Sequence, residues 1–208
     1  EFAPETSLTL EPKKKEFDVR EEWPECAGRA GNVLDQGRCG SCWAFAASET
    51  LSDRHCVASK GDVDVQLSPQ HLVACDKSNM GCNGGYLDKS WTFMERNGVV
   101  TDKCFPYTAG SGREGECEVA DGNCVDESEP YVLYHAKNSA DCAGAKNMEK
   151  SLKKDGSVEV GFYVYSDFMQ YKSGVYYHKS GGLLGGHAVK VIGFGEEDGM
   201  DYWIIVNS

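Results

Sequence analysis

The sequence predicts an α+β fold of two lobes, a helical N-terminal lobe followed by a β-rich C-terminal lobe. Three observations support this class. Helical signals are concentrated in residues 16–115, strand-forming runs lie within residues 116–208, and residues 108–130 form a Gly-, Glu- and Asp-rich stretch with two cysteines. We expect a ligand cleft between the lobes, with the N-terminal segment able to cross to the other lobe.

The first two helices of the N-terminal lobe have clear starts. Ser41 can cap a helix that begins at Cys42, and the alanines that follow favour the helical state. Ser68 is a suitable cap for a second helix, with Pro69 at its first position.

A third helix is predicted within residues 86–98. Leu87, Trp91 and Met94 are spaced along one face of it, and Gly98 ends it where a left-handed residue is favoured.

The second half of the chain changes to strand signals. Residues 157–165, 187–195 and 202–208 are β-branched and aromatic, as strands are. One amphipathic helix is expected before the first of these strands, capped by Asp141 and closed by Gly156.

Composition narrows the function classes. The 208 residues are 40% hydrophobic, with a net charge of −12 and a pI of about 4.8. The sequence shows no basic patch of the kind that a nucleic-acid binder carries. The negative net charge also disfavours binding to anionic membranes. No apolar run reaches the roughly 18 residues of a membrane span. Residues 1–10 lack the pattern of a secretory signal, and residues 11–17 resemble an exposed, cleavable linker.

The cysteine count indicates an oxidising compartment, which would be lysosomal, endosomal, a secretory vesicle or extracellular. The ten cysteines are at positions 26, 39, 42, 56, 75, 82, 104, 117, 124 and 142. The chain has a single CxxC, from Cys39 to Cys42, so a structural zinc site is disfavoured. We expect no metal and no cofactor.

Cys42 could be half of a disulfide, a metal ligand, one arm of a redox pair or a nucleophile. A thiol attacks as its thiolate, and a helix N-terminus lowers the thiol pKa. The expected helix places Cys42 at such a point. Gly37 and Gly40 leave room for a substrate backbone to approach.

His187 is the best candidate for an imidazole partner. It follows two glycines and opens an apolar strand, where it can face a cleft. Asn207 closes another apolar strand, and its amide oxygen could orient that imidazole. The other histidines are expected to be ordinary surface, turn or loop residues: His55, His71, His135 and His178.

Four motifs in order resemble the papain-like cysteine proteases: DQGRCGSCWAF (35–45), GCNGG (81–85), GGHAVKVIGFG (185–195) and YWIIVNS (202–208). Within that family the chain is most similar to the cathepsin B branch. The stretches that support the branch are FDVREEWPEC (17–26), SDRHC (52–56), VYSDF (164–168) and YKSGVY (171–176). The resemblance implies a papain-like two-lobed fold with a β-barrel-like C-terminal lobe.

The family resemblance implies a role for each catalytic residue. Cys42 would be the nucleophile, His187 its ion-pair partner and Asn207 the residue that orients His187. Gln36 and the Cys42 backbone N–H would bind the oxyanion. The reaction would be peptide-bond hydrolysis through a thioester acyl-enzyme.

The resemblance also implies a set of substrate-binding residues. Gly84 and Gly85 would pair with the substrate backbone. Tyr86, Leu87, Gly161 and Ala188 match positions that line the subsite for the second residue before the cut. Gly186 and Trp43 complete the set, with Trp43 expected mainly to pack.

Similarity to the cathepsin B branch implies four disulfides: Cys26–Cys56, Cys39–Cys82, Cys75–Cys117 and Cys104–Cys124. Cys42 and Cys142 would then be free thiols.

The chain departs from the cathepsin B pattern in two places. Residues 104–117 replace a long loop that carries two histidines, and they contain none. We therefore expect a cleft open at both ends, internal cleavage, and weak or no carboxydipeptidase activity. The chain also stops at Ser208, directly after Asn207, so the C-terminal lobe is expected to be truncated.

The resemblance implies protein and peptide substrates, the chain's own propeptide and cystatin-like inhibitors as partners. Residues 1–15 are then expected to be a propeptide remnant or a linker. We expect a monomer, with no nucleic acid and no membrane. Two alternatives stay open from the residues alone. One is a catalytically inactive relative that acts as a binding module, and the other is a thiol–disulfide oxidoreductase that uses Cys39 and Cys42.

Overall fold

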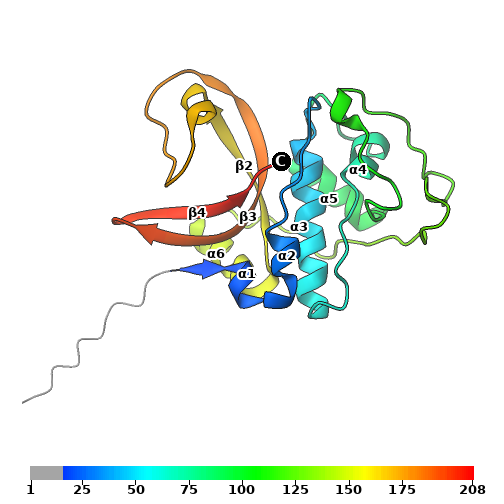
Figure 1. Cartoon of the computed structure of the whole chain (residues 1–208), viewed down its shortest axis with the longest axis horizontal. Helices are drawn as coiled ribbons and strands as arrows, with labels where there is room; N and C mark the ends of the chain where they lie inside the picture. The colour runs from blue at the N-terminus through cyan, green and yellow to red at the C-terminus, as the bar shows by residue number, and fades with distance from the viewer. Residues whose placement is uncertain (1–15) are drawn as a thin grey trace, which may run out of the picture.

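The computed structural model describes residues 16–208 and has two lobes with α3 running between them (Figure 1). The expected remnant at residues 1–15 lies outside the described residues. The helices are α1 (Val19–Glu22), α2 (Ala27–Ala30), α3 (Cys42–Ser59), α4 (Pro69–Cys75), α5 (Leu87–Arg96) and α6 (Ala145–Asp155). The strands are β1 (Phe17–Asp18), β2 (Val158–Tyr165), β3 (Leu183–Glu197) and β4 (Met200–Val206).

The helical lobe forms around α3, α4 and α5. Its core contains Trp43, Leu72 and Met94, all of them almost fully buried. Burial of such a side chain contributes about 1.5–3 kcal/mol each to stability. The Ser68 hydroxyl accepts a hydrogen bond from the His71 N–H and caps α4, which confirms the predicted cap.

The strand lobe is an open antiparallel sheet organised around β3. β2 pairs with one edge of β3, with Phe162 opposite His187, and β4 pairs with the other edge, with Val206 opposite Lys190. β1 also pairs with β3, through Phe17 opposite Phe194, so the start of the described chain crosses to this lobe. The expected barrel-like closure is not seen among the described strands.

Polar and charged side chains join the two lobes. The Lys190 ammonium on β3 is buried and lies 3.0 Å from a carboxylate oxygen of Asp53 and 3.6 Å from one of Glu49, both on α3. The Trp91 indole N–H on α5 donates to Glu159 on β2 at 2.6 Å. The Lys190 contacts connect the helix that begins at Cys42 to the strand that carries His187, and the Trp91 contact connects α5 to β2.

The structure corrects two expectations about capping. α6 begins at Ala145 after Gly144, not after Asp141, because Gly144 has φ +86° and breaks the regular backbone between them. Ser41 does precede α3, but its hydroxyl makes a hydrogen bond to the hydroxyl of Tyr107 rather than capping the helix.

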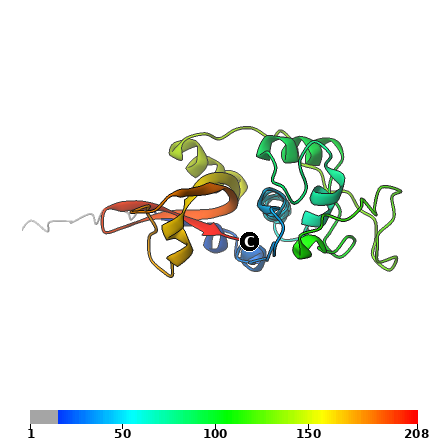
Figure 2. The same cartoon turned by 90° about the horizontal axis from the view of Figure 1, so that it is seen from above.

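The boundary between the lobes lies later than predicted. The predicted division falls between residues 115 and 116. In the structure Tyr134 still pairs with Val99, and Ala136 is part of the helical core. The chain therefore leaves the helical lobe after Ala136. The view from above in Figure 2 shows it crossing from there to α6.

Two histidines differ from the sequence expectation. His71 is buried on α4, where its Nδ1 accepts a hydrogen bond from the Val100 N–H, and burial lowers its pKa to about 4. His55 is half-buried on α3, and burial lowers its pKa as well. Polar neighbours in the sequence were misleading because, on a helix, they lie on other faces.

Candidate active site

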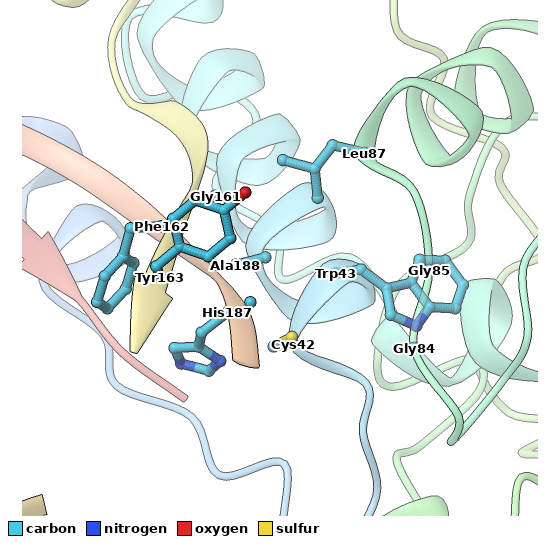
Figure 3. A pocket seen from close by; sticks show the side chains of 11 residues that line it. Cys42, Trp43, Gly84, Gly85, Leu87, Gly161, Phe162, Tyr163, His187 and Ala188 are labelled. Atoms are coloured by element: carbon cyan, nitrogen blue, oxygen red, sulfur yellow. The ribbon is translucent and has the colours of Figure 1, made fainter. Parts of the chain in front are cut away.

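A cavity of about 450 Å³ lies between the lobes, with α3 on one side and β2 and β3 on the other. Figure 3 shows the Cys42 sulfur and the His187 ring beside each other, with Trp43 next to Gly85 on the helical side. The residues that line it are Cys42, Trp43, Gly84, Gly85, Leu87, Gly161, Phe162, Tyr163, Gly186, His187 and Ala188.

Cys42 is the first residue of α3 and is a half-buried free thiol. Burial raises the pKa of the thiol, but hydrogen bonds with His187 and with the Ala188 N–H lower it by more. The helix N-terminus adds unpaired N–H groups that favour a negative charge. The net result is a pKa below the ordinary value, which favours the thiolate.

His187 lies on β3 between Cys42 and Asn207. Its Nε2 is 2.6 Å from Asn207 Oδ1. Because an amide oxygen can only accept, Nε2 carries the proton and Nδ1 is left for Cys42. The hydrogen bond with Cys42 raises the pKa of His187; burial opposes it, and Asn207 and the charge of Cys42 raise it further. The lowered pKa of the thiol and the raised pKa of the imidazole together favour a thiolate–imidazolium pair.

Gln36 lies on the segment that leads into α3. Its Nε2 donates to the Cys39 carbonyl at 3.1 Å, and its Oε1 accepts from the Ser208 hydroxyl at 2.9 Å. The first bond uses one of two amide hydrogens, so the second is left for another acceptor.

Disulfides join the segment before α3 to the rest of the helical lobe. Cys39 is bonded to Cys82, and the Gly40 N–H donates to the Cys82 carbonyl at 2.9 Å. A Cβ on Gly40 would lie 2.5 Å from that carbonyl oxygen, so the approach needs glycine. The structure contains the four pairs that the resemblance implies: Cys26–Cys56, Cys39–Cys82, Cys75–Cys117 and Cys104–Cys124.

Trp43 is almost fully buried, yet it lines the cavity on the helical side (Figure 3). Its indole N–H donates to the Gly81 carbonyl at 3.1 Å, and a Cβ on Gly85 would lie 2.5 Å from its ring. The indole therefore supports the backbone of Gly84 and Gly85 from behind, which agrees with the expectation that Trp43 mainly packs.

Most of the predicted substrate-binding residues line the cavity. Tyr86 does not: it is exposed at the start of α5, and the Lys89 ammonium lies 4.4 Å from its ring centre. The sequence argument missed Phe162 and Tyr163, which line the strand side. Phe162 is near the site because the register of β2 on β3 puts it opposite His187. The sequence does not show this register, because it depends on how the two strands pair.

Within residues 16–208, no group of three or more His, Cys, Asp and Glu side chains could hold a metal ion. In the same range no helix is long and apolar enough to span a bilayer.

Comparison with known proteins shows which family shares this arrangement. The model of the papain family cysteine proteases matches residues 13–208. The chain belongs to this family. It is 45% identical over 195 residues to "Cathepsin B-like CP3" of Giardia intestinalis, with 92% of this chain and 63% of that protein covered. It is 37% identical over 223 residues to "Cathepsin B-like cysteine proteinase 5" of Caenorhabditis elegans, covering 92% of this chain and 64% of that protein.

Solved structures of the papain family share the fold. A procathepsin B S9 from Trypanosoma congolense has a TM-score of 0.84 and 33% identity, covering 99% of this chain and 70% of that one. The ragweed pollen protease Amb a 11 in its proform has a TM-score of 0.73 and 25% identity, covering 97% and 57%. The chain spans just under two thirds of the length of the curated relatives quoted above.

The papain-family geometry also bears on the redox alternative. Cys39 is bonded to Cys82, and the Cys42 thiol is free and hydrogen-bonded to His187. Cys39 and Cys42 therefore do not form the exchangeable pair that a thiol–disulfide oxidoreductase needs.

Proposed function

We propose that the cleft hydrolyses peptide bonds within protein chains, with Cys42 as nucleophile and His187 as its acid and base. The observation that carries this proposal is the alignment of Cys42, His187 and Asn207. A thiol of lowered pKa at a helix start faces an imidazole of raised pKa, and Asn207 fixes the imidazole's tautomer.

The reaction has two halves. The Cys42 sulfur bonds to the scissile carbonyl carbon, and the oxygen takes up the negative charge. The Cys42 N–H and the second amide hydrogen of Gln36 donate to that oxyanion. The amine leaves with a proton from His187 and a thioester remains. Water then attacks the thioester, His187 accepts the water's proton, and the carboxylic acid departs as the thiol is restored.

Substrate binding follows from the cavity walls. The backbone of Gly84 and Gly85 can pair with an extended substrate, since no side chain blocks the approach. Gly161 faces Leu87, and a Cβ there would still lie 3.7 Å from it. The subsite between Leu87, Gly161 and Ala188 is therefore lined by apolar groups.

We further propose that cleavage is internal and that carboxydipeptidase activity is weak or absent. Residues 104–117 contain no histidine, and within them the Gly110 carbonyl accepts a hydrogen bond from the Arg38 N–H at 2.9 Å. No imidazole of this segment is available to bind a substrate's C-terminal carboxylate.

The proposal extends to the setting of the protein. The disulfides suit a lysosomal, endosomal, vesicular or extracellular compartment. Mildly acidic pH suits the ion pair because the imidazolium must persist. The proposed partners are protein and peptide substrates, an inhibitory propeptide and cystatin-like inhibitors, with the protein acting as a monomer.

An epoxysuccinyl peptide probe tests the proposal. Labelled peptides are mapped by mass spectrometry in the wild type, in Cys42→Ala and in Cys142→Ala, which removes the other free thiol. We expect labelling of Cys42 alone, because burial raises the pKa of Cys142 whereas that of Cys42 is lowered. No labelling and no hydrolysis by the folded protein would support the inactive binding module instead.

A second assay separates internal from terminal cleavage. A quenched peptide is compared in two forms, with a C-terminal amide and with a free carboxylate. We expect cleavage of both at similar rates and at internal bonds. Preferential release of C-terminal dipeptides from the free acid contradicts the proposed specificity.

A further inference from the structure

The segment from Cys104 to Cys117 packs against the loop that precedes the nucleophile. The Arg38 N–H donates to the Gly110 carbonyl at 2.9 Å, and the two segments lie side by side next to the start of α3 (Figure 1). Gly37 has φ +63°, and a Cβ there would lie 2.6 Å from the Gly110 oxygen. The fit leaves no room for a side chain, so the position of one segment constrains the other.

Tyr107 makes the central contact. Its hydroxyl donates to the Gln36 backbone carbonyl at 2.8 Å and also lies 2.8 Å from the Ser41 hydroxyl. A phenol has one hydrogen, so the Ser41 hydroxyl is the donor in the second bond. The phenol thus ties together the residue proposed to bind the oxyanion and the residue just before Cys42.

The Tyr107 ring is itself fixed. It packs edge-on against Phe45 in the first turn of α3, with ring centres 4.7 Å apart. Burial raises the pKa of Tyr107, which favours the protonated hydroxyl that donates to Gln36.

Gln70 holds the segment from the other side. This fully buried amide accepts from the Thr108 and Ala109 N–H groups at 2.9 and 3.0 Å and donates to the Glu114 carbonyl at 2.7 Å. A buried side chain that satisfies three backbone groups fixes the shape of the segment around Tyr107.

We propose that Tyr107 is a positioning residue for the oxyanion donor: its hydroxyl holds the Gln36 backbone so that the Gln36 amide stays aimed beside Cys42. The inference rests on the proposed function. It adds a role for residues 104–117, which hold the segment of residues 36–41 in place instead of closing the cleft. A donor misplaced by a fraction of an ångström loses much of its value toward a developing charge.

Tyr107→Phe tests the role, because it removes the hydrogen bond and keeps the ring on Phe45. Hydrolysis of a peptide amide is compared with alkylation of Cys42 by iodoacetamide, a displacement that forms no oxyanion. We expect kcat to fall about tenfold with KM nearly unchanged, a fraction of the loss from removing a donor outright. The rate of alkylation and its pH profile stay as in the wild type.

A double-mutant cycle with Gln36→Ala sharpens the test. Gln36→Ala alone is expected to lower kcat by about 10²-fold. If Tyr107 acts through Gln36, adding Tyr107→Phe to Gln36→Ala lowers kcat little further. Tyr171→Phe is the matched control, since the Tyr171 hydroxyl donates to the Gly174 carbonyl at 2.6 Å in the other lobe.

The outcomes separate the two proposals. Wild-type hydrolysis by Tyr107→Phe overturns the positioning role and leaves the proposed function intact. Equal losses in hydrolysis and alkylation also overturn it, because they indicate a general disturbance of the site. Full additivity with Gln36→Ala overturns action through Gln36. If the wild type itself is neither labelled at Cys42 nor able to hydrolyse peptides, it is the proposed function that fails.

Discussion

The two sides of the cleft hold their proposed catalytic groups in different ways. On the helical side, the segment before Cys42 is fixed by the Cys39–Cys82 disulfide and by hydrogen bonds from Gly40 and Tyr107. On the strand side, His187 is partly exposed within the β2–β3 pairing, and its partner Asn207 is exposed just beyond β4. The nucleophile side is covalently braced, and the imidazole side depends on noncovalent contacts.

The difference matches what each group must do. In the proposed mechanism the thiol and the oxyanion donors act at fixed points, so a rigid segment keeps them correctly oriented. In the proposed mechanism the imidazole serves first as an ion-pair partner and then as an acid and a base, so it needs orientation more than immobility. The buried Lys190 connects the sides, because it joins β3, three residues after His187, to Glu49 and Asp53 on α3.

The largest expected effect comes from removing the imidazole. His187→Ala should lower kcat/KM by about 10⁴-fold or more. It should also raise the pKa of Cys42, since the hydrogen bond with His187 lowers it. The check is peptide hydrolysis together with the rate of Cys42 alkylation at about pH 5.5. Unchanged alkylation at that pH would show that the helix N-terminus suffices to activate the thiol. His135→Ala is the control.

The second-largest expected effect comes from removing the Cys39–Cys82 disulfide on the nucleophile side. The Cys39→Ala/Cys82→Ala variant opens a loop of 43 residues, which should cost about 4 kcal/mol of unfolding free energy. Chemical denaturation measures that loss. Under conditions where it stays folded, activity should fall as well, because Gln36 donates to the Cys39 carbonyl.

The Cys26–Cys56 disulfide, with a separation of 30 residues, provides the control for that variant. Cys26→Ala/Cys56→Ala should lose a similar free energy but keep the specific activity of its folded fraction. Equal loss of activity in both variants would argue against a special role for the brace beside Cys42.

Removing the orienting amide should have a smaller effect. Asn207→Ala should lower kcat by about 10²-fold, as expected for a misaligned group. The hydrogen bond with Asn207 raises the pKa of His187, so its loss lowers that pKa. The imidazolium is then lost at lower pH, and the alkaline limb of the pH–rate profile should move to lower pH. Asn147→Ala on α6 is the control, and an unmoved limb counts against the assigned tautomer.

The smallest expected effect is on stability, and it concerns Glu49, which contacts Lys190 between the two sides of the cleft. Burial raises the pKa of Glu49 to about 7, although Lys190 lowers it. The folded state therefore holds a proton that the unfolded state releases near pH 4.5. The resulting stability is present below that pH and lost as the pH rises to about 7.

Glu49→Gln should abolish this pH dependence. Asp53 remains as a partner for Lys190, so we expect a gain of about 2 kcal/mol at about pH 8 and little change at about pH 4. Denaturation at both pH values, with the exposed Glu118→Gln as the charge-matched control, provides the measurement. A variant that keeps the wild-type slope excludes Glu49 as its source.

The sequence predicted local structure best where one residue acts on its own neighbours. Ser68 and Pro69 predicted the start of α4, and Gly98, at φ +73°, marks the end of α5. The prediction failed where two local signals pointed to different starts of one helix. Asp141 could cap a helix, but α6 begins later, after Gly144.

Burial of single polar residues was the weakest point of the sequence argument. His71 has polar neighbours and is nevertheless buried, because α4 turns it toward α5, where its ring meets Phe93 edge-on. Tyr107 lies in residues 104–117, and the sequence argument noted only that this segment contains no histidine.

The sequence by itself determined the family motifs, the two-lobed fold class and the candidates Gln36, Cys42, His187 and Asn207, because these depend on residue types in fixed order. Only the tertiary structure decided that Tyr107 supports the Gln36 backbone, that Phe162 lies opposite His187 and that Lys190 links the lobes. Those contacts join residues tens of positions apart. Their partners are set by strand register and by packing between lobes, which no local pattern encodes.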